Sequence, residues 1–216
     1  MKLSAHTISI LKSFKDINEG IEFRKGQSKI GTVGKSRTIM AFAQIEEQFP
    51  VNFAIADISG FLGCMSIFNE PEFTFHDEYV IISQGQQQIR YTFCDPAALI
   101  LPAEGKDFSL KNPVATFPLK SSDIKGIIRS IGLLKLPDFS ILSENGNIIV
   151  KSMNEKNKSG NEYSVIVGTT DATFNIVFDA EIIINIMERD YTVEIDKRGM
   201  AYLYNDDIAY FIAPKK

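Results

Sequence analysis

Hydrophobic residues recur at helical spacing at the start of the chain. Between Ser4 and Asn18 they fall three or four positions apart, a spacing typical of an amphipathic helix. The positions are Thr7, Ile10, Leu11, Phe14 and Ile17. Ser4 is a suitable N-cap residue, and Gly20 lies just past the end of the pattern. The pattern predicts a helix over 4–18 with its apolar side buried.

Short apolar or alternating runs follow and predict strands. They cover 21–30, 38–43 and 51–56, then 72–75, 79–83 and 88–93 after a second helical pattern. This second helix is expected over 57–69, with Asp57 as its N-cap and Pro71 limiting its extension. Its expected buried side comprises Ile58, Phe61, Leu62, Met65 and Phe68. Ser59, Gly63 and Ser66 are expected on the exposed side.

The order of elements then repeats. A stretch rich in Pro and Gly between 95 and 113 has no sustained period and predicts a boundary. After it comes a helix whose expected buried side comprises Ile124, Ile127, Ile128, Ile131 and Leu134, followed by a hairpin turn at 143–146. A last helix opens at Asp179, whose side chain is expected to cap free amide groups, and exposes Glu181, Asn185, Glu188 and Arg189. Closing strands are expected at 191–195, 200–204 and 208–212. We therefore predict an α+β fold of two similar domains, each with two helices packed on antiparallel sheet.

The expected limits are 1–103 for the first domain, 104–118 for a connector and 119–216 for the second domain. An internal duplication explains the repeated order. Chance similarity between two α+β halves is the alternative, because helix and strand assignments from one sequence are error-prone.

The net charge of the chain is small, but basic residues gather on two predicted helix faces. The chain has 216 residues, 44% of them hydrophobic, and a net charge of -4, so it is not a basic protein that wraps nucleic acid. On a helical wheel, however, the first helix of each half exposes a short basic face. The residues are Lys2, Lys12 and Lys15 in the first half and Lys125 and Arg129 in the second. We interpret them as non-specific phosphate contacts; an ordinary solvated face is the alternative.

Patterns for other chemistry are weak. Cys64 and Cys94, like His6 and His76, lack the spacing of a metal site, so no metal or cofactor is expected. The segment 31–36 resembles a phosphate loop but lacks its first glycine, and we assign it to a hairpin turn. No nucleophile has a base at a suggestive spacing, so we expect no enzyme. The chain lacks a run of about 18 apolar residues and a signal sequence, which favours a cytosolic protein without membrane contact.

Particular residues nevertheless match a known family. They run from Met1-Lys2-Leu3-Ser4 through Thr7, Leu11-Lys12, Phe14, Ile17-Asn18 and Gly20-Ile21 to Ala54-Ile55, Asp57, Gly60-Phe61-Leu62-Gly63, Ser66 and Asn69. In these residues the chain resembles the sliding clamps of T-even-type bacteriophages. The similarity continues more weakly to Arg129, and beyond it only the order of elements supports the resemblance.

The resemblance implies a DNA-clamp fold, with three two-domain subunits forming a ring. Such a ring is not an enzyme. It encircles duplex DNA without sequence specificity and tethers the replicative DNA polymerase after an ATP-dependent clamp loader has opened and closed it. The implied location is the cytoplasm of the infected bacterial host, and late-transcription factors are further implied partners.

The resemblance also suggests sites. Lys12 and Arg129 match basic family residues on the corresponding helices. Ring closure in the family joins edge strands of neighbouring subunits, and our candidates are the strands 98–101 and 163–167, which supply Leu99, Leu101, Tyr163, Val165 and Val167. That both are internal strands is the alternative. For the pocket that receives a partner's peptide beside the connector, the candidates are Leu101, Phe108, Phe117 and Phe211.

Two other functions compete with the clamp. One is a monomeric, two-domain phage accessory or structural protein that binds other proteins and not DNA. The other is a single-strand binder, which would need aromatic residues exposed along a basic groove. The Phe and Tyr residues here fall mostly at core-type positions of strands, which argues against the latter.

Overall fold

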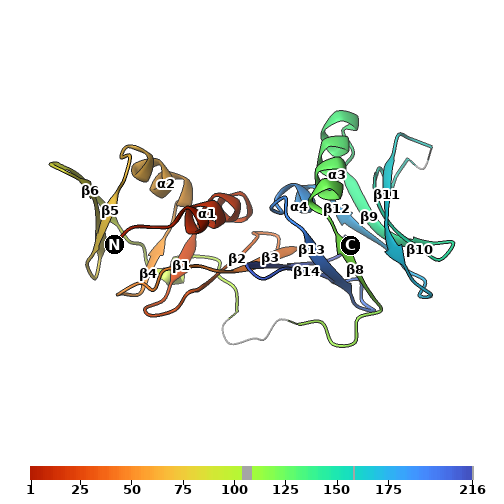
Figure 1. Ribbon diagram of the computed structural model, residues 1–216, viewed down its shortest axis with the longest axis horizontal. Helices are drawn as coiled ribbons and strands as arrows, with labels where there is room; N and C mark the ends of the chain where they lie inside the picture. Colours follow the sequence, from red (N-terminus) through yellow and green to blue (C-terminus); the bar gives the residue numbers. More distant parts are fainter. Residues whose placement is uncertain (104–108, 158, 216) are drawn as a thin grey trace. The chain divides into compact units, whose positions relative to one another are not determined.

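The computed structural model describes residues 1–103, 109–157 and 159–215. The chain divides into two compact units, Met1–Gly105 and Lys106–Lys216 (Figure 1). Among the described residues each unit has two α-helices and antiparallel strands, so the predicted α+β class and the two similar domains are confirmed. None of the described helices is long and apolar enough to cross a membrane.

The two helices of unit 1 form where the sequence predicts them. Helix α1 covers Ala5–Ile17, and its five buried residues are those of the predicted apolar side. Ser4 caps it by accepting a hydrogen bond from the N–H of Thr7. Helix α2 covers Ile58–Ser66, capped by Asp57, which accepts from the N–H of Gly60 at 2.9 Å. Its exposed side carries the small residues predicted there.

The described residues of unit 1 contain seven strands, and neighbouring strands pair antiparallel. They are β1 (Ile21–Phe23), β2 (Lys29–Val33), β3 (Ile39–Gln44), β4 (Phe53–Ile55), β5 (Glu72–Phe75), β6 (Tyr79–Gln84) and β7 (Gln87–Thr92). β1 pairs with β4, β2 with β3, and β5, β6 and β7 form one sheet in that order. The single run predicted over 21–30 is therefore wrong, because the chain turns at Gly26 with a positive φ of 69°.

The segment 31–36 also differs from its assignment to a turn. Gly31 to Val33 belong to β2, and the turn begins only at Gly34, whose carbonyl accepts from the N–H of Arg37. A strand follows this turn, so the segment has no helix to hold a phosphate.

Phenylalanine rings fill one end of the unit 1 core. Phe23 and Phe53 stack with centroids 4.5 Å apart, and Phe49 meets both edge-on. Phe75 and Phe93 contact Phe53 from β5 and from the residue after β7. Such offset and edge contacts add to the burial of large apolar area. They fix β1 and β4 to the β5–β7 sheet.

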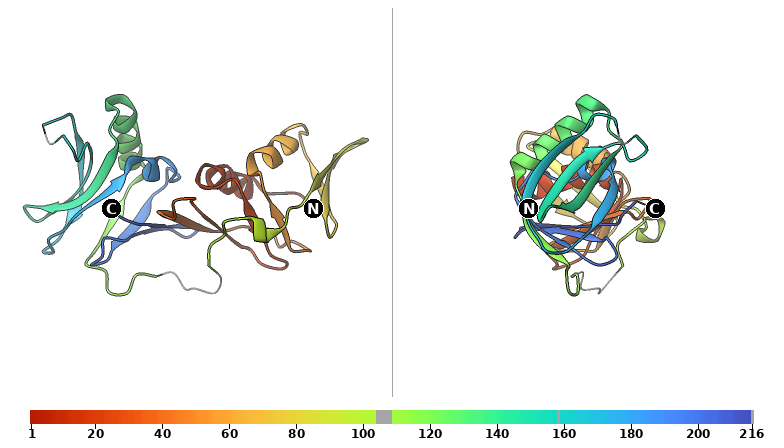
Figure 2. Two further views of the ribbon diagram at one scale, coloured as in Figure 1. Left: turned by 180° about the vertical axis from the view of Figure 1, so that it is seen from behind. Right: turned by 90° about the vertical axis from the view of Figure 1, so that its right-hand side faces the viewer.

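In the part of unit 2 that the structure describes there are two further helices and eight strands. They are β8 (Ala115–Leu119), α3 (Ser121–Leu134), β9 (Asp138–Glu144), β10 (Asn147–Met153), β11 (Tyr163–Thr169), β12 (Asn175–Asp179), α4 (Ala180–Ile184), β13 (Tyr191–Ile195), β14 (Ala201–Tyr204) and β15 (Ile208–Ile212). One sheet has the order β11-β10-β9-β12. In the other, β13 lies between β8 and β14, and β15 follows β14. Helix α3 packs on β10 and β11 (Figure 2).

The β9–β10 hairpin turns as predicted. Asn145 and Gly146 both have positive φ, at 51° and 77°, as a two-residue turn of this kind requires. β8 begins at Ala115, inside the stretch 104–118 where we expected the connector. The predicted domain limits themselves stay predictions.

Three expectations for the helices of unit 2 are wrong. Leu134 is not buried but 38% exposed, and Ser130 is buried instead, where its hydroxyl lies 2.6 Å from that of Ser152. Helix α4 has only five residues, so Glu188 and Arg189 lie beyond it. Asp179 occupies the N-cap position but its side chain caps no amide, and it faces Lys215 at 3.7 Å.

Candidate nucleic-acid and subunit interfaces

Helix α1 presents the basic residue that the sequence predicts. Lys12 is exposed, and within the described ranges it has no ion pair, whereas Lys15 lies 3.7 Å from Asp16. Lys2 precedes the helix and pairs with Glu70 at 2.7 Å, which raises the pKa of Lys2. Its placement on the helical face was therefore wrong. Lys12 is left as the free cation of this helix.

A buried carboxylate holds the start of α1 in place. Glu47 is 8% exposed and accepts hydrogen bonds from the backbone N–H of Ser4 and from the hydroxyl of Thr7. It thereby satisfies a donor that the first turn of a helix leaves without an intrahelical partner. No local pattern in the sequence indicates this contact, since Glu47 lies 43 residues from Ser4.

Replacing Glu47 by alanine is expected to lower the free energy of unfolding by about 2 kcal/mol, because two hydrogen bonds to a charged acceptor are lost. Urea-induced unfolding followed by circular dichroism measures this. Glu46→Ala is the matched control, since Glu46 is the neighbour of Glu47 in the chain and makes neither contact. Equal stability of the two variants would contradict the role of Glu47.

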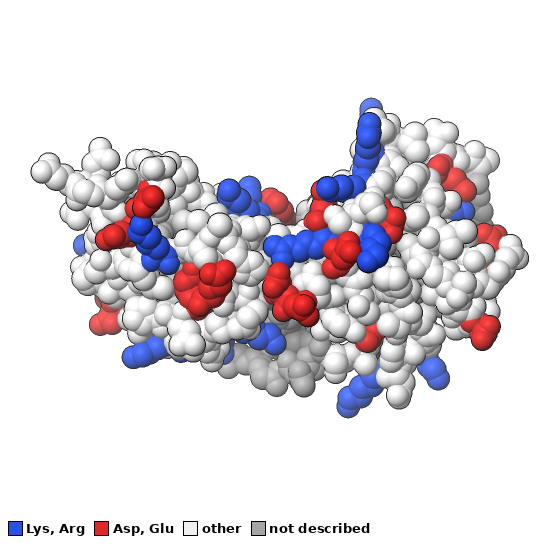
Figure 3. Space-filling view, in the orientation of Figure 1, with Lys and Arg blue, Asp and Glu red and all other residues white. Residues whose placement is uncertain are grey.

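Helix α3 repeats the arrangement in unit 2. Arg129 is exposed and has no ion pair within the described residues, whereas Lys125 lies 3.6 Å from Glu188. Lys and Arg side chains are visible over α1 and along α3 (Figure 3). Each unit therefore offers one unpaired cation on the exposed face of its first helix.

Asp190 holds the start of α3 from outside the helix. It accepts from the N–H of Ser121 at 2.8 Å and pairs with Lys120 at 3.0 Å, and these contacts lower the pKa of Asp190. Glu188 and Asp190, which neighbour the basic face, were not among the predicted site residues. Both residues follow α4 in the chain, and no pattern in the sequence indicates that they lie beside the basic face of α3.

One of the two predicted interface strands is absent. Residues 98–101 form no strand. A 3-10 helix, η1 (Pro96–Ala98), begins after its N-cap Asp95 and ends at Ala98. Leu99 and Leu101 are half-buried, and Leu99 packs on Gly20, where an added Cβ would lie 2.7 Å from its side chain.

The other predicted strand is an edge. β11 pairs only with β10 in its sheet, and its exposed residues include Tyr163 and Ile166, the latter 63% exposed. In unit 1, β5 and β7 each pair with β6 alone within their sheet, but Phe73 of β5 also exchanges hydrogen bonds with Met1, which leaves β7 as the freer edge. β7 was not predicted as an interface, because the strand order that leaves it at an edge is set by distant pairings. An apolar edge strand is a ready template for pairing with another chain.

The predicted partner-binding residues are not gathered at one exposed place. Phe117 and Phe211 are buried in unit 2, Leu101 is half-buried in unit 1, and Phe108 lies outside the described residues. Their role in binding peptides stays a prediction.

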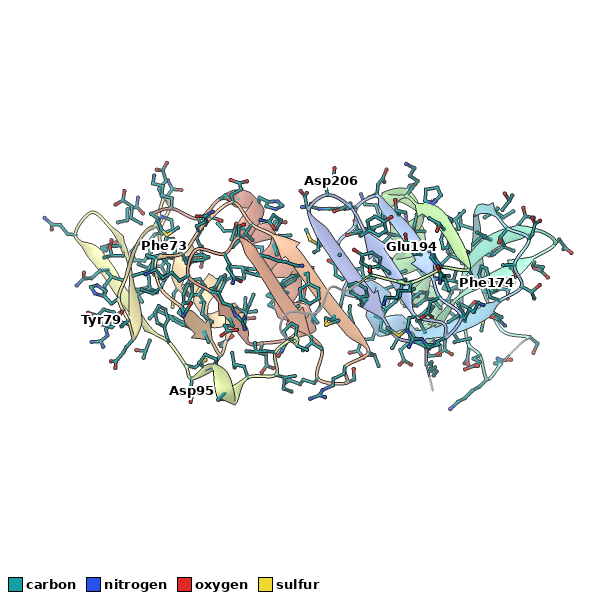
Figure 4. The ribbon with its side chains drawn as sticks, turned by 90° about the horizontal axis from the view of Figure 1, so that it is seen from below. Phe73, Tyr79, Asp95, Phe174, Glu194 and Asp206 are labelled. Carbon is teal, nitrogen blue, oxygen red and sulfur yellow. The ribbon has the colours of Figure 1, made fainter. Side chains whose placement is uncertain are left out.

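A cavity of about 590 Å³ opens in unit 2, and none of the described residues Leu101, Phe117 and Phe211 is among those lining it. It lies between β12 and the β13–β14 turn, and Phe174 (labelled in Figure 4) contributes to its lining. Val114, Ile176, Val177, Gly199, Pro214 and Lys215 contribute to its lining. Val114 precedes β8, and Pro214 follows β15. The cavity therefore borders the end of the expected connector and the closing strand.

Residues for metal binding are not gathered in any described part of the chain. No group of three His, Cys, Asp or Glu side chains there could hold an ion, and Cys64 and Cys94 are free thiols. Burial raises the pKa of the Cys94 thiol, which disfavours its reactive thiolate form.

No family model matches the chain. Among curated proteins, the sliding clamp of Vibrio phage KVP40 is 28% identical over 219 aligned positions, which cover 99% of this chain and 98% of the relative. The sliding clamp of Enterobacteria phage T4 is 28% identical over 186 positions, covering 83% and 80%.

Solved structures give the fold. The proliferating cellular nuclear antigen of Entamoeba histolytica superposes with a TM-score of 0.72 at 11% identity, covering 100% of this chain and 98% of that one. The beta clamp of Helicobacter pylori, bound to a DNA ligase peptide, gives 0.72 at 14% identity, covering 100% of this chain and 65% of that one. The PCNA of A. fulgidus, bound to the C-terminal region of FEN-1, gives 0.73 at 9% identity, with 99% and 97% covered. The chain is thus a sequence relative of the sliding clamps of T4-type phages, over nearly its whole length, and it has the fold of PCNA and the beta clamps.

Proposed function

We propose that this protein is a sliding clamp, which encircles duplex DNA and tethers the replicative DNA polymerase for processive synthesis. The observation that carries the proposal is the full-length similarity to a phage sliding clamp, together with two units of the clamp fold in one chain. Its place of action is the cytoplasm of the infected bacterial host. It catalyses no reaction; it holds the polymerase on the DNA template.

Sparse basic residues suit this function. A protein of net charge -4 with a single unpaired cation on the first helix of each unit would hold DNA weakly through phosphate contacts alone. A closed ring needs no tight grip, because escape requires opening of the ring. Weak phosphate contacts also let the ring slide.

A ring needs subunits joined head to tail, and two edges in this chain support that. We propose a homotrimer in which β11 of one subunit pairs with β7 of the next. The two edges are different surfaces, so their pairing is heterologous and repeats until the ring closes. β7 takes the place of the strand that we expected at 98–101.

Other proteins complete the cycle. We propose that an ATP-dependent clamp loader opens the ring and that late-transcription factors are further partners. The polymerase and these partners would dock through short peptide segments, with the cavity bordered by Val114 and Pro214 as the receiving site.

Retention on DNA of different topology tests the function. After loading with the phage clamp loader, the protein is expected to persist on nicked circular duplex DNA and to leave linear duplex within minutes. Gel filtration of labelled protein with each DNA measures both. Blocking the linear ends with bound protein should restore retention. Equal retention on circular and open linear DNA would contradict a clamp, and absence from both would favour the monomeric accessory protein.

A further inference from the structure

The end of the described chain leaves β15 in one sheet of unit 2 and is held against β12 and β9 of the other sheet. After β15 ends, Lys215 donates its backbone N–H to the carbonyl of Val177 on β12 at 2.8 Å. Its Nζ pairs with Asp138 at the start of β9. We call residues 213–215 the tail strap. It occupies part of the outer edge of β12, because β12 pairs only with β9 within its sheet.

The carboxylate under the strap requires a cation. Asp138 is 1% exposed, and its second oxygen accepts from the N–H of Glu155 at 2.9 Å. Among the described residues, Lys215 is the one cation within ion-pair distance of Asp138. This contact also raises the pKa of Lys215 and keeps its ammonium group charged. A buried carboxylate that loses its cation is strongly destabilised, so displacement of the strap is favoured when another cation takes its place.

The strap is also a wall of the cavity in unit 2. Pro214 and Lys215 line it on one side, and the β13–β14 turn lines it on the other. At the turn, a Cβ added to Gly199 would lie 3.1 Å from Ile176 and 3.5 Å from Pro214. Displacing the strap would therefore join the cavity to the free edge of β12.

We propose that an extended peptide of a partner protein docks on β12 by replacing the tail strap, and that this peptide supplies a lysine or arginine to Asp138. The proposal rests on the proposed function, in which partners dock through short peptides. The strap itself shows what fits: a backbone N–H for Val177 and an ammonium group for Asp138. Addition of a strand to a sheet edge is a common way to recognise a peptide. The strap acts as a competitor that any partner must displace.

The test frees Asp138 in the full-length chain with Lys215→Ala and supplies a cation in trans. The probes are fluorescein-labelled peptides of sequence Ile-Ala-Pro-Lys-Lys and Ile-Ala-Pro-Met-Met. By fluorescence anisotropy, the lysine peptide is expected to bind K215A at least tenfold more tightly than it binds the unsubstituted protein. It should also bind K215A at least tenfold more tightly than the methionine peptide does. Adding Asp138→Asn should abolish this preference.

Lys156→Ala is the matched control, because Lys156 is an exposed lysine of the same unit that does not line the cavity and has no ion pair in the described part of the chain. This variant should bind as the unsubstituted protein does. Equal binding of the lysine peptide by K215A and the unsubstituted protein, or no preference for lysine over methionine, would overturn the proposal.

A second measurement covers a K215A protein too unstable for titration. Its melting temperature should rise in n-butylammonium chloride relative to potassium chloride, and no rise should occur when Asp138→Asn is added. Absence of the rise would overturn the proposal. Retention on circular DNA is measured on the unsubstituted protein and does not depend on the peptide titration. A failure of the proposed clamp function is therefore distinguished from a failure of peptide binding in place of the tail strap.

Discussion

Reversing the charge of Lys12 and Arg129 together is expected to shorten the time that the loaded protein spends on circular DNA. Both side chains are exposed, and both have no ion pair in the described part of the chain. They are therefore available to phosphates without breaking an existing contact. Each phosphate contact contributes roughly 0.9 to the slope of log affinity against log salt, so losing two per subunit removes most of the electrostatic attraction.

We expect polymerase products made with the K12E/R129E protein at about 150 mM salt to shorten on the order of tenfold. The measurement is primer extension on circular template with loader and ATP. The control is K25E/K156E, which reverses two exposed lysines outside the helices and brings the net charge from -4 to the same value. Equal product lengths for the two variants would show that total charge matters and the helix faces do not.

Sequence patterns predicted those elements whose stabilising contacts lie within one segment of the chain. Helix α1 matches its pattern because a serine cap and five apolar residues at helical spacing act within one segment. Helix α4 is shorter than expected although its apolar residues have the right spacing. Its isoleucines are β-branched and favour helix only weakly, and Asp190, soon after it, is drawn to the start of α3.

Contacts between distant segments escaped prediction. The run 98–101 is apolar enough for a strand, but Asp95 and Pro96 set a 3-10 turn before it and Leu99 packs on Gly20. β7 is an edge only because of the order in which β5, β6 and β7 pair.

Of the candidate site, the sequence predicted the free cations Lys12 and Arg129, since helical periodicity alone separates an exposed face from a buried one. It did not predict which neighbouring lysines are paired. Glu70 lies 68 residues from Lys2, and Asp138 lies 77 residues from Lys215. Such partners meet only after the chain has folded, and no period in the sequence records them.

Placing a charge on the edge of β11 is expected to dissociate the ring. Ile166 is 63% exposed, so a lysine there can reach water in the isolated subunit and unit 2 should fold unchanged. In a ring whose subunits pair β11 with β7, the same lysine would lose water at every junction. A buried cation without a partner costs several kcal/mol, and about 3 kcal/mol corresponds to a hundredfold weaker junction.

Native mass spectrometry at micromolar concentration is expected to show three copies of the 24.2 kDa chain for the unsubstituted protein and the monomer for Ile166→Lys. The control is Ile184→Lys, which places the same charge on an isoleucine that is 48% exposed and belongs to α4, not to either edge strand. I184K should remain trimeric. If I166K keeps the trimer while its melting temperature is unchanged, β11 is not the junction. Because topological retention requires a closed ring, the monomeric variant should also leave circular DNA as fast as linear DNA, which joins the subunit contact to the function in one comparison.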